Sequence, residues 1–376
     1  VEAQDFLLGT EVLVPSGAKA RARANIAALR LVQHLEQQQR PATADEQAVL
    51  AQWSGWGAIP EVFDNRARIL AQWGDEHAEL RDLLGDKGFA QARQTTLNAH
   101  YTDPAIVSEL WRAVQRAGLP EGAVVLEPGC GAGHFVGTAP GSVRMVGVEI
   151  EPISAKIAHY LYPSQQIRNH GFERNFAPED TFTAAIGNVP FGKFAPVDPI
   201  HNADGLSIHN HFIAKSLALT APGGYVAVVT SMFTSDARRA DERAAIVAKG
   251  DLIGAVRLPT GAFERQAGTD VVTDVLIFRR RDDGAEPTDD TLEWAQPAVQ
   301  VEAVDAKTGE TTHTWINPYF AKYPERVLGT LTVGNGMYAG SSLRVAPTTG
   351  RPLAEQLRTQ LDPLIDQALG RGLGIT

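Results

Sequence analysis

The sequence feature that most constrains the fold lies at residues 124–135, which read VVLEPGCGAGHF. A short apolar run ends in Glu127, turns through three alternating glycines, and continues into an apolar segment that is compatible with a helix. Glycines let a backbone adopt positive φ and approach a ligand closely, and the start of a helix offers unpaired N–H groups. The stretch therefore predicts a strand, a tight ligand-binding loop and a helix, in that order.

The loop has the spacing ExGxGxG, formed by Glu127, Gly129, Gly131 and Gly133. A dinucleotide-binding loop would read GxGxxG. An acidic residue beside a bound phosphate would be repelled, whereas the same residue beside a cationic ligand is favourable. The spacing resembles motif I of the methyltransferases that use S-adenosylmethionine, whose sulfonium and amino groups are positive. A glycine-rich turn without such a ligand is the alternative interpretation.

A second stretch, at residues 186–192, reads IGNVPFG and follows another apolar run. Its NVPF resembles the [DNS]PP[YFW] motif of enzymes that methylate planar amino groups. Such an amino group is a poor nucleophile, and two acceptors that hold its hydrogens, Asn188 and the carbonyl of Val189, would favour its attack. Pro190 completes the motif, and Phe191 would stack on an extracted base. Val189 stands where the family has its first proline, so the acceptor carbonyl is kept without the fixed φ of proline.

Two further pairs of residues are candidates for cofactor binding. YTDP, at residues 101–104, resembles motif X of one class of adenine methylases, and by that match Thr102 and the backbone beside Tyr101 contact the methionine end of the cofactor. The same stretch is a clear helix start, because an aspartate can cap the helix and a proline suits its first turn. The apolar run 143–150 ends in Glu149, which is well placed to accept both ribose hydroxyls, with Ile150 against the adenine. An ordinary glutamate at a strand end is the alternative.

Phe172 and Glu173 follow the third predicted strand, where the family usually has an acidic residue and then an aromatic residue that contacts adenine. Here the acid comes after the aromatic residue, which leaves the assignment of the two roles open. His209 and His211, in IHNHF, resemble metal ligands at first sight. Without a cysteine partner or an acidic cluster, we interpret them as the start of a helix and expect no metal.

The whole pattern predicts an α/β protein with a seven-stranded, Rossmann-like class I methyltransferase sheet. The later strands are expected at 165–171, 182–187, 223–230, 251–258 and 271–278, the last two forming a hairpin. Helices at 18–39, 43–53 and 80–93 predict a helical N-terminal region over residues 1–94, followed by a methyltransferase domain over 95–281. Residues 282–376 are expected to hold an acidic linker, a small extension and a final helix near 352–369. In WSGWGAIPEVFD (residues 53–64) the tryptophans predict a buried corner, with stacking on a nucleic acid as the alternative.

Composition limits the partners and the compartment. The net charge of −10 argues against nucleic acid, but residues 282–310 hold nine acidic residues and one lysine, which account for most of it. Arg238, Arg239 and Arg243, and the run 279–281, could meet phosphates or form a solvated edge. The single cysteine, Cys130, excludes an internal disulfide and fits the cytoplasm. No apolar run is long enough for a membrane span, no signal peptide is visible, and the start at Val1 indicates a processed chain or a piece of a longer one.

Taken together, the motifs resemble the N6-adenine methylase-like portion of large phage- and plasmid-borne methylase and helicase fusion proteins, some of which are called antirestriction proteins. The match covers roughly residues 45–335. The resemblance implies transfer of a methyl group from S-adenosylmethionine to N6 of adenine in DNA, either double-stranded with a flipped adenine or single-stranded. It also implies a helicase segment beyond Thr376. Two alternatives stay open: methylation of another planar amino group, in RNA or on a protein glutamine, and a module that binds cofactor and DNA with little turnover.

Overall fold

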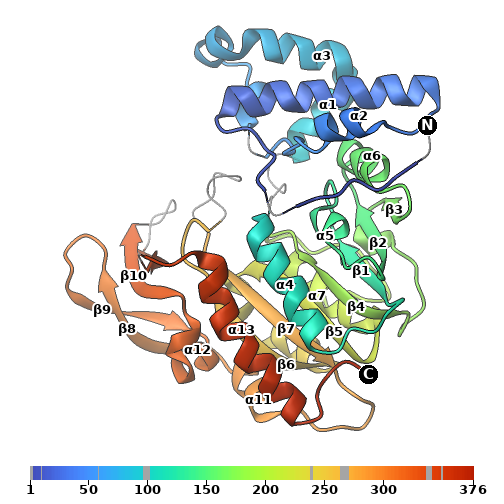
Figure 1. Ribbon diagram of the computed structural model, residues 1–376. Helices are drawn as coiled ribbons and strands as arrows, with labels where there is room; N and C mark the ends of the chain where they lie inside the picture. The colour runs from blue at the N-terminus through green and yellow to red at the C-terminus, as the bar shows by residue number, and fades with distance from the viewer. Residues whose placement is uncertain are drawn as a thin grey trace.

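The computed structural model describes residues 3–9, 11–57, 59–95, 102–237, 240–262, 271–335, 341–348 and 350–376. Tyr101, Arg238 and Arg239 therefore lie outside the described residues. A seven-stranded sheet lies at the centre of the molecule (Figure 1). Its strands are β1 (Val124–Pro128), β2 (Arg144–Glu149), β3 (Gln166–Asn169), β4 (Phe182–Asn188), β5 (Thr220–Ser231), β6 (Gly250–Arg257) and β7 (Thr273–Arg280).

The strands of this sheet run in the order β3-β2-β1-β4-β5-β7-β6. Neighbours from β3 to β5 are parallel, whereas β7 is antiparallel to both β5 and β6. This order, with its reversed β7, is the class I methyltransferase sheet, and the predicted fold class and hairpin are confirmed. The order of strands reverses direction between β1 and β4, and in open α/β sheets ligands bind outside the carboxyl ends of the strands at such a point.

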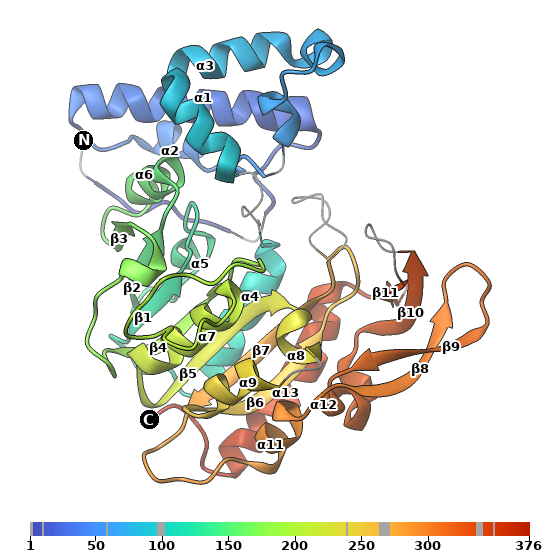
Figure 2. The same ribbon diagram turned by 180° about the vertical axis from the view of Figure 1, so that it is seen from behind.

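Both faces of the sheet are buried, which explains why its strands are nearly continuous apolar runs. Along β5, Tyr225 and Val229 belong to the core on one face, and Val226 and Val228 belong to the core on the other. Helices α4 and α13 cover the first face, and α7, α9 and α11 cover the second (Figures 1 and 2). Their bounds are α4 (Pro104–Arg116), α7 (Ile208–Leu219), α9 (Asp241–Val247), α11 (Asp289–Ala295) and α13 (Leu353–Gly370).

Two predicted helix starts are confirmed. The Asp103 side chain accepts a hydrogen bond from the Ala105 N–H at 2.8 Å, and Pro104 is the first residue of α4. Helix α7 begins at Ile208, so His209 and His211 lie in its first turn, as predicted. The short elements between the strands are α5 (His134–Gly137), α6 (Pro152–Leu161), η2 (Phe172–Arg174) and α8 (Phe233–Asp236).

The N-terminal region is helical, as predicted, and consists of α1 (Ala18–Gln38), α2 (Ala44–Leu50), η1 (Pro60–Phe63) and α3 (Ala67–Thr95). Helix α3 is longer than predicted and is interrupted at Gly85, whose φ is 64°. The region lies over α6 at the carboxyl ends of the strands (Figure 1). The Gln47 amide donates to the Tyr160 carbonyl at 3.0 Å, and the Trp53 indole N–H donates to the Ser154 hydroxyl at 3.0 Å.

The acidic stretch 282–310 is not a linker, and that prediction was wrong. It contains α11 and β8 (Val299–Asp305), and β8 belongs to a second sheet in the order β11-β10-β8-β9. Thr288 caps α11, and the buried Trp294 packs edge-on against Phe278 with ring centroids 5.3 Å apart. This apolar contact is enough to hold the segment against the sheet, because most of its acidic side chains remain exposed to water and do not have to be buried. The other elements are β9 (Thr311–Ile316), α12 (Pro318–Lys322), η3 (Pro324–Arg326), β10 (Gly329–Asn335) and β11 (Ser341–Pro347).

The candidate phosphate-binding arginines that the structure describes are buried instead. Arg281 pairs with Asp251 at 3.1 Å, and Arg243 donates to the Gln296 carbonyl at 2.8 Å. Arg279 and Arg280 are also buried, so neither a phosphate-binding edge nor a solvated edge is formed there. Within the described ranges, none of the helices combines the length and the apolar character that a membrane crossing requires.

Candidate active site

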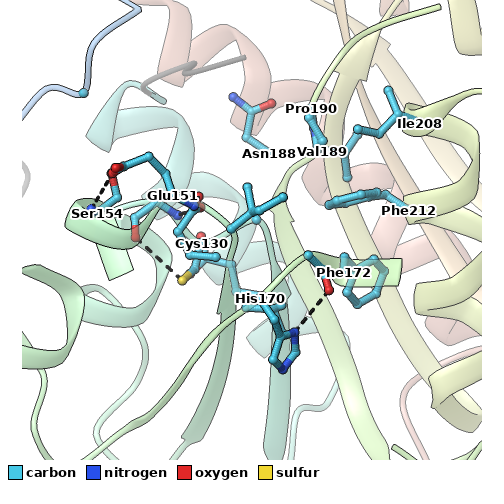
Figure 3. A pocket seen from close by; sticks show the side chains of 18 of the residues that line it. Cys130, Glu151, Ser154, His170, Phe172, Asn188, Val189, Pro190, Ile208 and Phe212 are labelled. Atoms are coloured by element: carbon cyan, nitrogen blue, oxygen red, sulfur yellow. Dashed lines mark hydrogen bonds between the residues drawn. The ribbon is translucent and has the colours of Figure 1, made fainter. Parts of the chain in front are cut away.

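A cavity of about 780 Å³ lies between the N-terminal helical region and the carboxyl ends of β1, β2 and β4. Most of the residues predicted from the motifs line it: Thr102, Glu127, Gly129, Gly131, Glu149, Ile150, Phe172, Glu173, Asn188, Val189 and Pro190. Figure 3 shows Asn188, Val189 and Pro190 on one side of this space and Cys130 and Glu151 on another. Gly133 and Phe191 do not line the cavity, although both adjoin residues that do.

The glycine loop is held in place by β2 and by its own glycines. The Gly129 and Cys130 N–H groups both donate to the Val148 carbonyl, at 2.8 and 2.9 Å. Gly129, Gly131 and Gly133 all have positive φ, between 54° and 88°. A side chain at Gly133 would also come within 2.8 Å of the Tyr162 ring. The alternation of glycines is therefore required by the turn itself, whatever the ligand.

Glu127, the next-to-last residue of β1, has a buried carboxyl group with a spare acceptor. The residue is 2% exposed, and its Oε2 has no hydrogen-bond partner among the described residues. Burial raises the pKa of Glu127 well above its ordinary value, and the neighbouring Glu149 raises it further. A buried acceptor of this kind is costly unless a donor or a cation completes it. The site therefore suits a ligand with a positively charged or hydrogen-bond-donating group.

Glu149 lies at the end of β2 and joins the glycine loop to α6. Its carboxylate accepts the Gly131 N–H and the Glu151 N–H, each at 2.7 Å. Burial raises the pKa of Glu149 to about 7, despite these two hydrogen bonds, which lower it. Each carboxylate oxygen has a further lone pair, which can accept a ligand hydroxyl. The next residue, Ile150, is 65% exposed at the cavity wall, so its side chain is accessible to a ligand in the cavity.

Asn188 ends β4 with its amide oriented by a neighbour. The Asn188 Nδ2 donates to the Thr102 hydroxyl at 3.0 Å, whereas Oδ1 is buried without a partner in the part of the chain that the structure describes. The next residue, Val189, is fully buried, and its N–H donates to the Val229 carbonyl at 3.0 Å. This hydrogen bond extends the pairing of β4 and β5 by one residue. A proline could not make it, so the valine fixes this position by a different means.

The loop after β4 forms another wall of the cavity. It contributes Phe194, which is 52% exposed, whereas Phe191 is half-buried. A buried ion pair anchors the loop to α7, because Asp198 accepts from Lys215 at 2.8 Å and from His211 at 3.0 Å. Lys215 also donates to the Phe172 carbonyl at 2.8 Å. One ammonium group thus ties the β4 loop to the turn that carries Phe172 and Glu173.

Several lining residues were not predicted from the sequence. The turn at residues 53–56 and two side chains of α3, Gln91 and Gln94, reach the cavity from the N-terminal region. The tryptophans of the turn are buried, with ring centroids 4.8 Å apart, which confirms the predicted corner. Sequence offered no signal that this corner faces the glycine loop, because only the folded arrangement brings residues so distant in the chain together. Phe194 could have been found, since it lies only three residues after the NVPF motif.

S-adenosylmethionine is the cofactor expected for this fold, and the residues present fit it. The spare oxygen of Glu127 suits a cationic or N–H group, the lone pairs of Glu149 suit ribose hydroxyls, and the exposed Ile150 suits an aromatic base. Among the described residues, no group of three or more His, Cys, Asp and Glu side chains is arranged to hold a metal ion.

Comparison with known proteins gives one curated relative with significant similarity. The chain is 30% identical over 190 residues to the Defense against restriction protein B of Escherichia phage P1. That alignment covers 49% of this chain, and this chain spans only 8% of the length of the phage protein. No protein-family model matches the sequence.

Solved structures with a similar fold include a type I restriction-modification methyltransferase subunit from Streptococcus thermophilus. It is 12% identical with a TM-score of 0.45, and the alignment covers 93% of this chain and 79% of that one. A modification subunit of a type I restriction enzyme from Vibrio vulnificus is 17% identical with a TM-score of 0.42, over 80% of this chain and 67% of that one. By its strand order and its sequence similarity, the chain is a class I methyltransferase-fold protein related to a phage protein of defence against restriction.

Proposed function

We propose that the protein transfers a methyl group from S-adenosylmethionine to N6 of adenine in DNA. The observation that carries this proposal is the orientation of Asn188. Its amide nitrogen donates one N–H to the Thr102 hydroxyl, which fixes the orientation of the amide, and its oxygen is buried without a partner among the described residues. An acceptor held in this way suits the N–H group of an amine that must be positioned for attack.

The roles of the residues follow from this arrangement. When bound, the cofactor supplies a methyl group made electrophilic by a sulfonium. Asn188 Oδ1 and the Val189 carbonyl accept the two hydrogens of the adenine amino group, which directs the nitrogen lone pair toward that methyl group. The hydrogen bond from the Val189 N–H to the Val229 carbonyl keeps the Val189 carbonyl in place. After transfer, the extra proton on the nitrogen leaves along one of these two hydrogen bonds and passes to water.

The adenine ring needs an aromatic partner, and by the motif we assign this role to Phe191. Phe194 is a second ring in the same loop, and it already lines the cavity. The two rings are distinguished by single alanine substitutions. Loss of a stacked ring costs about 1–3 kcal/mol per base, so the variant that loses stacking should bind the adenine-containing oligonucleotide at least several-fold more weakly.

The experiment that tests the proposed function follows tritium from the methyl group of S-adenosylmethionine onto DNA, RNA and protein substrates offered separately. We expect label on adenine-containing DNA, and digestion to nucleosides should yield N6-methyladenosine in its deoxy form. Label on RNA or on protein alone would assign the same acceptors to another planar amino group. Cofactor binding by calorimetry without label on any substrate would indicate a binding module.

Asn188→Ala should abolish transfer and leave the fold intact, because the residue is at the edge of the cavity rather than in the core. Asn169→Ala is the matched control, since its amide also donates near the site, to the Glu149 carbonyl at 2.8 Å, but it does not line the cavity. Equal activities of wild type and the Asn188 variant would refute the mechanism.

A further inference from the structure

A second hollow of about 610 Å³ lies along α3 and has no part in the proposed mechanism. We call it the α3 hollow. It adjoins the candidate active site, because Gln94 lines both spaces, and Gln91, three residues earlier on the same helix, lines the first. Residues three apart lie on one face of a helix, so the two amide side chains form a shared border. A flexible polymer that leaves the active site past Gln94 therefore enters the α3 hollow.

Aromatic rings form one side of the α3 hollow. Phe89 packs against Phe63 and against His77, with ring centroids 5.0 Å apart in each case. Phe63 is buried, but Phe89 and His77 are each half-buried, so part of each ring faces the hollow. The three rings are inclined to one another, so the exposed part of a single ring, that of Phe89, is the surface on which a planar base can stack.

Guanidinium groups form the other side. Arg81 and Arg93 both line the hollow, and the Arg81 guanidinium lies 5.8 Å from the centre of the Phe89 ring. Asp86 is the one carboxylate among the lining residues, and it pairs with Arg81 at 2.7 Å. Asp64, outside the lining, also attracts Arg93, because Arg66 chiefly and Arg93 in addition lower the pKa of Asp64. Its side chain is 85% exposed, so this ion pair is screened by water and a phosphate can replace it. A guanidinium binds phosphate through two parallel hydrogen bonds, which a carboxylate of this exposure does not prevent.

We propose that the α3 hollow is a subsite for the nucleotide next to the target adenine. The base of that nucleotide stacks at Phe89, and its phosphate binds Arg81 and Arg93. The amides of Gln91 and Gln94 lie between the two spaces, where they meet the edges of the bases. Positive groups that follow the backbone, combined with aromatic rings that stack on bases, are the usual means of binding single-stranded nucleic acid. The inference rests on the proposed function for the class of ligand.

The test measures binding of the full chain to a short, fluorescein-labelled, single-stranded DNA oligonucleotide that contains one adenine. Fluorescence anisotropy gives Kd at several salt concentrations, with S-adenosylhomocysteine present to prevent turnover. Arg81→Ala and Arg93→Ala should each raise Kd about tenfold at low salt. Each should also reduce the slope of log Kd against log salt concentration by about one, because one phosphate contact is lost. Phe89→Leu should raise Kd by a similar factor without changing the salt dependence.

Lysine at either arginine position should restore most of the salt dependence, because it keeps the charge. Arg144→Ala is the matched control: Arg144 is an exposed arginine at the first residue of β2, at the end of that strand away from the cavity, and its loss should leave Kd unchanged. Cofactor binding by calorimetry should be the same in all variants.

The subsite is refuted if the Arg81→Ala, Arg93→Ala double variant keeps the Kd and salt dependence of wild type, even where DNA is methylated. It is also refuted if wild type binds no oligonucleotide. A third refuting result is that an acidic peptide binds and the oligonucleotide does not, with the peptide's binding lost in the two arginine variants. If the arginine variants lose oligonucleotide binding while wild type methylates no DNA, the subsite stands and the proposed function fails.

Discussion

The Glu149 carboxyl group gives a quantitative prediction for the dependence of stability on pH. In the folded protein its pKa is about 7, against an ordinary value of 4.5, chiefly because it is buried. That difference corresponds to about 3 kcal/mol between its two protonation states. Because the folded-state pKa is the higher one, the contribution to stability is complete below pH 4.5 and is lost as the pH rises through about 7.

The perturbation that isolates this group is Glu149→Gln, which keeps the shape of the side chain and removes the titration. The glutamine loses one of the two backbone N–H acceptors, which costs about 1 kcal/mol at every pH. The unfolding free energy of wild type minus that of the variant should therefore fall by about 2 kcal/mol between pH 5.5 and pH 8.5. The fall is smaller than about 3 kcal/mol because part of the contribution is already lost at pH 5.5.

The assay is urea unfolding of both proteins without cofactor, followed by tryptophan fluorescence at several pH values between these limits. Glu127 also has a raised pKa, but it remains in both proteins, so the comparison between them largely removes it. A constant difference in unfolding free energy across this range would show that the Glu149 carboxyl is not perturbed by burial. A difference that grows in the opposite direction would show that the ionised form is the one the fold stabilises.

Three further predictions concern single residues. Thr102→Val removes the hydroxyl that holds the Asn188 amide, so kcat for methyl transfer should fall by up to about tenfold, the value of one hydrogen bond, while Thr102→Ser retains it. Gly133→Ala should lower the unfolding free energy by about 1–3 kcal/mol, because φ is 88° there, whereas Gly141→Ala, in open space, should be neutral within about 0.5 kcal/mol in the same urea titration. Lys215→Met leaves a buried carboxylate without its cation and should cost about 3–5 kcal/mol by thermal unfolding.

Each of these has an outcome that would contradict it. Unchanged kcat in the valine variant would mean that the amide of Asn188 is oriented by something other than the hydroxyl. Equal stabilities of the two alanine variants would mean that the glycine loop tolerates a side chain. A methionine variant as stable as wild type would mean that the carboxylate of Asp198 becomes protonated or reaches water at little cost.

The sheet was predictable because its signals are local. Asp103 and Pro104 define the start of α4 within two residues of the chain, and the glycines after Glu127 define a turn that few other residues can form. The strands are apolar runs of ordinary length, and the family resemblance supplied their order. These features depend on neighbouring residues in sequence, so they can be read before the fold is known.

What could not be predicted depends on contacts between distant residues. The arginines at 279–281 look like a basic edge. In the fold, however, Arg281 donates to the Asp251 carboxylate, thirty residues earlier in the chain, and to the Val247 carbonyl. The acidic stretch looks like a linker, yet one buried tryptophan at 294 fixes a helix in it. The walls that α3 and the turn at 53–56 contribute to the active site have no signal in the sequence, because the strand ends that they face, from Glu127 onward, are more than thirty residues away.

The position of the helical region across the mouth of the active site has a consequence for how the protein responds to what it binds. Trp53 and Gln47 attach this region to α6, and the same region supplies part of the ligand cavity. A ligand that touches both walls therefore stabilises the attachment of this region to α6 by its own binding free energy, by thermodynamic linkage. Resistance of the first hundred residues to limited proteolysis should rise with ligand concentration, and this protection would report occupancy even for molecules that are never methylated.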